Sequence, residues 1–437
     1  MHEPTALVDT PLTRGTAATV IETRDAILRG AVTVDEAVAA CRARIRETND
    51  ALAAFTVVNE AAASPVASEL PLAGISVGVK DLYDTAGMTT TYGSPIYRDH
   101  VPTADAALVA RLRELGAHVA GKTVTTEFAW RQAGPTVNPW NTAHTPGGSS
   151  SGSAAAVAAG LVPLATGTQT FGSVIRPAAF CGIVGFKPSH GLLPLDGVQP
   201  LSPTLDHGGL FARSVADIAH VFGHLTNETT APPERSPRLR LVRGPYWPQA
   251  SGTQRAVLDK AAASFAGRGA TVEEAELPVA FDEALAIAEV ILCHEAGRIY
   301  APLAASHPDL LSQHMKELVA RGQALSRDEV EGALLARSEL KRAFGEAIAG
   351  CDAILTLPAL GEAPPLGEGT GNAAPCVTWT LLGLPALTLP WAAGEANLPL
   401  GLQLVGRSGS DHALLSVAAW CERPRPLAGT DAGDGAC

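Results

Sequence analysis

One stretch of small residues constrains the fold of this chain more than any other. Thr145 to Ser189 reads TPGGSSSGSAAAVAAGLVPLATGTQTFGSVIRPAAFCGIVGFKPS. Glycine and serine at this density are typical of flexible linkers, but a linker is not followed by AAAVAAGLV, whose small apolar side chains favour a closely packed helix. We therefore expect the Gly/Ser loop to be part of the protein core.

Two serines lie in the loops on either side of this helix. Ser149 precedes the helix, and Ser173 follows the next apolar segment. At such places backbone N–H groups are left free and can stabilise a negatively charged oxygen. A serine hydroxyl is a poor nucleophile at neutral pH, so a base is required. The candidate base is Lys80, which ends the apolar strand in GISVGVKDLYDTAG and which we expect to be buried.

These blocks resemble the amidase signature family, in particular its malonamidase-like branch. The family pattern contains a lysine in a G-V-K-D strand end, a GGSS-x-GS loop, and a GT-x-T-x-GS segment followed by Arg, Pro and CG-x-x-G-x-KP. Four further blocks match in the same order, namely TEFA (126–129), GPTVNPWN (134–141), LLGLPALTLP (381–390) and LPLGLQLVGR (398–407). The resemblance thus covers most of the chain through several independent blocks.

The resemblance implies an amidase that needs no metal and no cofactor. In such an enzyme Ser173 is the nucleophile, Lys80 is the base, and Ser149 relays the proton between them after a cis peptide at Gly148–Ser149. Burial would lower the pKa of the Lys80 ammonium toward the working pH, so that the neutral amine can accept a proton. Four backbone N–H groups would hold the oxyanion, those of Thr170, Phe171, Gly172 and Ser173.

Two of these roles have a structural alternative. Lys80 could be an ordinary surface lysine at a strand end. Ser149 could be a structural serine in a glycine turn, with three neighbouring serines as equivalent polar fillers: Ser150, Ser151 and Ser153. Cys181, between AAF and GIVGF, favours core packing rather than catalysis.

The oxyanion segment departs from the usual family pattern D-T-G-G-S. Gln169 replaces the aspartate, as it does in the malonamidase-like branch, and Phe171 replaces a glycine. Phenylalanine keeps its N–H but tolerates a positive φ poorly and adds a bulky ring. Either the loop does not need that backbone conformation, or the pocket is reshaped and turnover of standard amides is reduced.

Three residues are candidates for binding the substrate: Arg176, Trp130 and Phe171. Arg176 lies three residues after Ser173 and matches an arginine that binds a substrate carboxylate in the malonamidase-like branch. A guanidinium there would favour a carboxylate through paired hydrogen bonds. The alternative for Arg176 is a buried structural pair with an acidic neighbour, and Trp130 could form either an aromatic pocket wall or core packing.

Two other catalytic motifs are incomplete. GSSSG (148–152) fits the G-x-S-x-G elbow of α/β-hydrolases with Ser150 as the nucleophile, but that motif needs a strand directly before it and NPWNTAHTP reads as a loop. His294 and Glu295 begin like a zinc H-E-x-x-H motif, but position 298 is arginine. We expect neither class of hydrolase.

The charge balance excludes several classes of partner. The net charge is −12 with no basic run, so nucleic acid and anionic membranes would be repelled. The first 25 residues lack the apolar core of a signal peptide, and no stretch of 18 apolar residues follows. The seven cysteines without a C-x-x-C pair favour reduced thiols. We expect a cytoplasmic protein whose partner is a small-molecule amide, and the resemblance allows a homodimer.

Helix and strand patterns alternate through most of the chain, which predicts an α/β sheet covered on both faces. The resemblance implies a large mixed β-sheet core sandwiched between helix layers. We expect an N-terminal helical layer over residues 1–65 and a single α/β/α domain over 66–425. This domain would carry a mostly helical insertion at about 280–350 and be followed by a disordered tail at 426–437.

Two further functions stay open beside amide hydrolysis by a Ser-cisSer-Lys triad. The first is the glutamine-hydrolysing subunit of a tRNA-dependent amidotransferase, although the combination of Gln169, Phe171 and Arg176 argues against it. The second is a weakly active or non-catalytic family member that acts as a binding protein. An intact Lys80, Ser149 and Ser173 argues against this reading, and Phe171 keeps it open.

Overall fold

One continuous mixed sheet runs through the computed structural model, which describes residues 17–62 and 65–422. Within these residues the sheet has 11 strands in the order β1-β3-β2-β4-β6-β5-β10-β11-β9-β7-β8. Their bounds are β1 Phe55–Val58, β2 Ser76–Lys80, β3 His118–Thr123, β4 Leu164–Gln169, β5 Val184–Lys187, β6 His207–Ala212, β7 Arg238–Leu241, β8 Thr271–Glu274, β9 Ala353–Thr356, β10 Ala386–Ala393 and β11 Pro399–Val405. β2 runs parallel to β3 and β4, whereas β4 and β6 are antiparallel.

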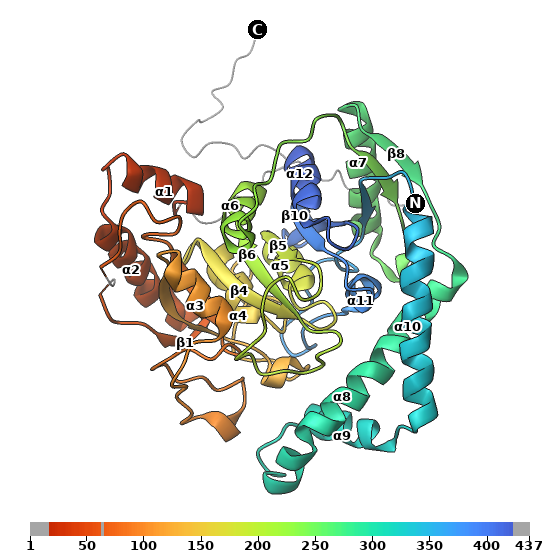
Figure 1. Cartoon of the computed structure of the whole chain (residues 1–437), viewed down its shortest axis with the longest axis horizontal. Helices are drawn as coiled ribbons and strands as arrows, with labels where there is room; N and C mark the ends of the chain where they lie inside the picture. Colours follow the sequence, from red (N-terminus) through yellow and green to blue (C-terminus); the bar gives the residue numbers. More distant parts are fainter. Residues whose placement is uncertain (1–16, 63–64, 423–437) are drawn as a thin grey trace.

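Helices cover both faces of this sheet (Figure 1). The helices α2, α4 and α5 pack against the sheet in one buried apolar cluster, and α6, α7 and α12 pack against it in a second one. The bounds of the helices are α1 Val20–Leu28, α2 Val34–Leu52, α3 Ala107–Glu114, α4 Ser151–Ala158, α5 Ile175–Cys181, α6 Val215–Thr226, α7 Gly252–Gly267, α8 Ala284–Ser306, α9 Gln313–Ala324, α10 Arg327–Ala347, α11 Ala374–Leu381 and α12 Asp411–Cys421. The predicted large mixed sheet between helix layers is thereby confirmed.

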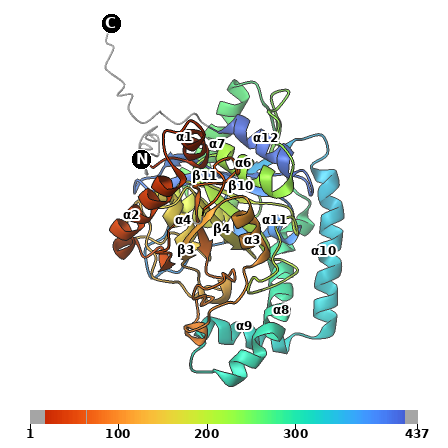
Figure 2. The same cartoon turned by 60° about the vertical axis from the view of Figure 1, so that its left-hand side comes forward.

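The helices α8, α9 and α10 pack on one another and project from one end of the molecule, away from α1 and α2 (Figure 2). A capping box formed by Ser326 and Glu329 is present at the start of α10, where each side chain bonds the backbone N–H of the other residue. Of these three helices, α8 and α10 also contact α11, whose N-cap residue Ala373 lines the cavity described below.

The small-residue stretch forms the centre of the core, as expected. All eight residues of α4 are buried. A Cβ at Gly152 would lie 2.1 Å from the carbonyl oxygen of Ala54 and 2.4 Å from the backbone nitrogen of Val124. Only a residue without a side chain lets the helix approach the neighbouring backbone this closely.

The segment after Ser173 differs from its expected conformation. The apolar run CGIVGF predicts a strand from Cys181 onward, but Cys181 ends helix α5 and the strand begins at Val184. Pro177 makes this helix difficult to predict from the sequence. Proline is tolerated in the first helical turn, because the N–H it lacks there would have no partner within the helix. Gly182, at φ 66°, then ends the helix.

Some expectations fall on residues that the structure does not describe. The tail expected at 426–437 and the first 16 residues of the N-terminal layer lie outside the described residues. In the described part, none of the helices combines the length and the apolar character that a membrane crossing requires.

Candidate active site

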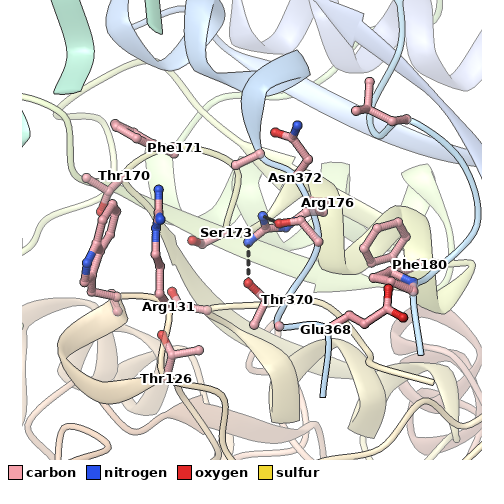
Figure 3. A pocket seen from close by; sticks show the side chains of 18 of the residues that line it. Thr126, Arg131, Thr170, Phe171, Ser173, Arg176, Phe180, Glu368, Thr370 and Asn372 are labelled. Carbon is pink, nitrogen blue, oxygen red and sulfur yellow. Dashed lines mark hydrogen bonds between the residues drawn. The ribbon is translucent and has the colours of Figure 1, made fainter. Parts of the chain in front are cut away.

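Both serine loops open into one cavity of about 870 Å³ (Figure 3). Ser149 and Ser173 line it together with the loop segment 129–131 and a distant segment at 360–373. Ser149, Ser173 and Trp130 are residues that the sequence predicts for the site. The segment 360–373 contains none of the predicted residues. The cavity therefore joins parts of the chain that are more than 200 positions apart.

Lys80 is the last residue of β2 and its side chain is fully buried. Its Nζ donates hydrogen bonds to Ser149 Oγ at 2.8 Å and to Thr168 Oγ1 at 2.7 Å. Burial lowers the pKa of Lys80 well below its ordinary value, and the negative charge of Asp206 opposes this shift. The amine can therefore lose its proton at a lower pH than an exposed lysine, which is what a general base requires.

Ser149 follows a cis peptide bond at Gly148–Ser149. Its side chain contacts Lys80 on one side and lines the cavity on the other. Ser173 lies in the loop between β4 and α5, and its hydroxyl makes no hydrogen bond with the rest of the described chain. The structure thus places Ser149 against Lys80, places Ser149 and Ser173 in the lining of one cavity, and leaves the Ser173 hydroxyl without a hydrogen-bond partner in the described chain.

The backbone of the loop before α5 explains how Phe171 is accommodated. Phe171 is not among the described residues with positive φ, so this loop does not need the glycine-like conformation. Within the described chain, no acceptor is found for the backbone N–H groups of Phe171, Gly172 and Ser173. A Cβ at Gly172 would lie 3.2 Å from Ala373 and 3.3 Å from Cys376, so close packing against α11 favours glycine there.

Gln169 holds this loop in place. Its Oε1 accepts hydrogen bonds from the backbone N–H groups of Val174 and Ile175, at 2.8 and 3.0 Å. Its Nε2 donates to Thr380 Oγ1 at 2.9 Å, and the Thr380 hydroxyl donates to the carbonyl of Phe171 at 2.8 Å. Sequence reasoning missed Thr380, because nothing in the local sequence of α11 signals a contact with position 171.

Replacing Gln169 with alanine is expected to lower both stability and turnover. Two buried N–H groups would lose their acceptor, which should reduce the free energy of unfolding by about 2–4 kcal/mol. Because the loop at Ser173 would also shift, we expect kcat to fall more than KM rises. Urea denaturation and steady-state kinetics measure the two effects. Gln254→Ala, which removes a buried hydrogen bond to Gly401 from a residue that does not itself line the cavity, is the control, and an equal loss of kcat in both variants would contradict the positioning role.

Asp206 is a second residue that the sequence did not reveal. Its Oδ1 accepts a hydrogen bond from Thr170 Oγ1 at 2.5 Å, and its Oδ2 accepts from the N–H groups of Leu201 and Ser202. Burial raises the pKa of Asp206 to about 6, against the effect of these hydrogen bonds. Above that pH its negative charge raises the pKa of Lys80.

Removing this charge should therefore change the pH dependence of activity. The uncharged amine of Lys80 is the form that accepts a proton, so activity should fall as the pH drops through the pKa of Lys80. In Asp206→Asn that pKa is lower, and the acidic limb of kcat/KM should move to lower pH. Asp99→Asn, at an exposed site, should leave the limb in place. A limb that stays fixed or moves to higher pH in Asp206→Asn would contradict this coupling.

Trp130 and Phe171 form one wall of the cavity. Their rings meet edge to face, with centroids 6.0 Å apart, and each residue is less than a tenth exposed. Trp130 thus lines the cavity and also packs against Phe171, which fits both the pocket-wall and the core-packing alternative.

Among the described residues, Arg176 lacks the acidic neighbour that a buried structural pair would require. Its Nη2 donates to the carbonyl of Gly148 at 2.7 Å and to Thr370 Oγ1 at 3.2 Å, and its Nη1 donates to the carbonyl of Gly371. No carboxylate among the described residues forms an ion pair with it, and its Nε is buried without a partner. Burial lowers its pKa to about 10. The side chain brings a positive charge to the cavity without a protein counter-charge.

Ser150 of the elbow motif and Glu295 of the incomplete zinc motif both have structural roles. Ser150 is fully buried, its Oγ bonds the backbone of Thr168, and it does not line the cavity. No strand directly precedes it, since β3 ends at Thr123, which agrees with the rejection of the elbow motif. Glu295 accepts hydrogen bonds from Ser202 and Thr204 instead of facing a metal site.

Comparisons with known proteins show the family to which the chain belongs. The family model described as Amidase matches residues 26–415. A glutamyl-tRNA(Gln) amidotransferase subunit of Nitratidesulfovibrio vulgaris (strain DP4) is 34% identical, with 94% of this chain and 97% of the relative covered. A solved amidase structure is 29% identical at a TM-score of 0.82, with 92% of this chain and 99% of that one covered. The native peptide amidase of Stenotrophomonas maltophilia is 27% identical at a TM-score of 0.78, with coverage of 95% and 99%. The chain belongs to the amidase family, the amidase signature enzymes.

Proposed function

We propose that this protein hydrolyses the amide bond of a small substrate that carries a carboxylate, through an acyl-enzyme on Ser173. The observation that carries the proposal is the buried Lys80 amine, which bonds Ser149 at the edge of the cavity that Ser173 also lines. Ser173 Oγ attacks the amide carbonyl, and its proton passes through Ser149 to Lys80. The same route returns the proton to the departing amine, and water then repeats the cycle to release the acid.

The loop at the start of α5 supports the charge that develops in this reaction. The N–H groups of Phe171, Gly172 and Ser173 have no acceptor in the described chain, and in the proposal they hold the oxyanion together with that of Thr170. One such donor contributes about 2.7–4 kcal/mol in comparable acyl-transfer sites. Catalytic hydrogen bonds often form fully only with bound substrate, which accounts for the unengaged Ser173 hydroxyl.

Arg176 supports the carboxylate in the proposed substrate. Its buried guanidinium has no counter-charge among the described residues, and an unpaired buried charge is unfavourable. A substrate carboxylate in the cavity would supply the missing charge and engage the guanidinium by charge-assisted hydrogen bonds. The wall of Trp130 and Phe171 would contact the apolar part of the same substrate.

A second candidate is the glutamine-hydrolysing subunit of a tRNA-dependent amidotransferase. The 34% identity to a protein of that name over nearly the whole chain supports this candidate better than a stand-alone amidase. Only three positions argue against it, Gln169, Phe171 and Arg176. Glutamine is itself a carboxylate-bearing primary amide, so the two candidates share the chemistry and differ in the acceptor and in the need for partner subunits.

A substrate panel tests both candidates. Wild type and Ser173→Ala would be assayed on glutamine, malonamate, succinamate, neutral and aryl amides, hydrazides and esters. Turnover of the carboxylate-bearing amides by the isolated chain supports the first candidate. Glutamine turnover that depends on co-purifying subunits supports the second. If no member of the panel shows Ser173-dependent hydrolysis and a fluorophosphonate fails to label the wild type, both are overturned and a binding protein is favoured.

A further inference from the structure

Arg131 is a second arginine in the cavity, and neither the triad nor the carboxylate site of Arg176 uses it. It lines the cavity, and its guanidinium lies over the ring of Trp130, 4.8 Å from the ring centroid. In Figure 3 its side chain extends along the cavity on one side of Ser173, while Arg176 lies on the other side. The positive charge of Arg131 also lowers the pKa of Arg176, as expected for two cations facing the same space.

The Arg131 guanidinium has no acidic partner among the described residues. It forms neither an ion pair nor a side-chain hydrogen bond there. Two glutamates line the same cavity, but the carboxylate of Glu362 accepts hydrogen bonds from the backbone N–H groups of Ala396 and Leu398. The other, Glu368, is exposed and lies beyond Arg176 as seen from Arg131 (Figure 3). The charge of Arg131 is thus directed at the cavity without a protein group to neutralise it.

The backbone at Arg131 is unusual for a residue with a long side chain. Its φ is 36°, in the left-handed region that favours glycine, and Phe128 and Ala129 before it also have positive φ. A non-glycine residue keeps such a conformation only when the surroundings enforce it, and such sites concentrate where ligands bind. Glycine would fit this backbone better, so an arginine at this position has a conformational cost.

Position in the cavity separates the roles of the two arginines. Arg176 is buried and held by backbone carbonyls, so it faces the interior end of the cavity. Arg131 is exposed and its guanidinium lies over the ring of Trp130, while its side-chain N–H groups have no acceptor among the described residues. Since Ser173 lies between them in Figure 3, an amide bond placed at Ser173 would have a cation on each side.

We infer that Arg131 is a specificity residue that binds a second anionic group of the substrate at the mouth of the cavity. The inference rests on the proposed function, which it deepens: the substrate class becomes an amide with a carboxylate on each side of the scissile bond. Glutamine, whose second polar group is an ammonium, fits this pair of arginines less well.

The test uses N-succinylglycine, an amide flanked by two carboxylates, and succinamate, which has only one. Binding to the inactive Ser173→Ala protein is measured by calorimetry with Arg131 intact and with Arg131→Gly or Arg131→Gln. Loss of a charge-assisted pair should weaken N-succinylglycine binding by roughly 10- to 100-fold, and more than it weakens succinamate binding. Arg98→Gln, which removes an exposed arginine paired with Asp99 elsewhere, should leave both affinities unchanged.

The two Arg131 variants separate binding from folding. Arg131→Gly removes the side chain from a glycine-favouring backbone, so its thermal stability should not fall, whereas a merely structural arginine would lower it. The affinity of the protein with Arg131 intact should also weaken as salt is added, and this dependence should be smaller in Arg131→Gln. Equal binding of N-succinylglycine in all proteins, or no binding in any, would overturn the inference. Absence of Ser173-dependent hydrolysis with Arg131-dependent binding intact would instead overturn only the proposed function.

Discussion

Ser173→Ala should lose hydrolysis by a factor on the order of 10⁶ in kcat, the largest effect expected of any single change in this chain. Removal of the nucleophile in other serine acyl-transfer enzymes has an effect of this size, because the remaining groups have nothing to activate. The fold should not change, since the Ser173 hydroxyl makes no hydrogen bond to the described protein. Steady-state kinetics on the best substrate of the panel measures the loss.

Covalent labelling gives an independent check of the same residue. A fluorophosphonate should add one adduct to the wild type, detected by intact mass, and none to Ser173→Ala. Ser338→Ala, on the exposed side of α10, should be labelled like the wild type. Hydrolysis by Ser173→Ala at the wild-type rate, or an adduct mapped to Ser149 or Ser150, would contradict the assignment of the nucleophile.

Lys80→Met should lower kcat by about 10⁴-fold while the protein remains folded. Methionine fills a similar volume, but it lacks the amine that accepts a proton from Ser149. In the wild type, activity should decline as the pH drops through the lowered pKa of Lys80, because protonation removes the base. The residual activity of Lys80→Met should lack this acidic limb. An unchanged pH profile in this variant would show that another group is the base.

The same lowered pKa predicts how stability depends on pH. An unfolded lysine keeps its proton up to a pH of about 10.4, whereas the buried Lys80 releases it at lower pH. The unfolded state therefore binds more protons in between, and burying Lys80 destabilises the fold fully below the folded pKa and progressively less as the pH rises. Urea denaturation should show the wild type gaining stability with pH relative to Lys80→Met. A constant difference between the two proteins would contradict a buried amine with a lowered pKa.

Much of the fold can be read from local patterns. The alternation of helix and strand periods predicts a sheet covered on both faces, and the structure has one mixed sheet between helix layers. Capping residues mark the starts of α2 and α10, since a cap acts on the helical turn next to it. The helices α5 and α11 escape such prediction because each is short and begins without a side-chain cap.

Sequence alone determined that Lys80, Ser149 and Ser173 are the candidate groups, because their chemistry depends on residue type within short motifs that keep their order along the chain. Only the tertiary structure decided what surrounds them. It hydrogen-bonded Thr170 to Asp206 and Thr380 to the carbonyl of Phe171. It also left Arg176 without an acidic partner among the described residues and placed the Arg131 guanidinium over the ring of Trp130. Most of these relations depend on strand order and on segments up to 209 positions apart packing together, and local periodicity carries no information about such contacts.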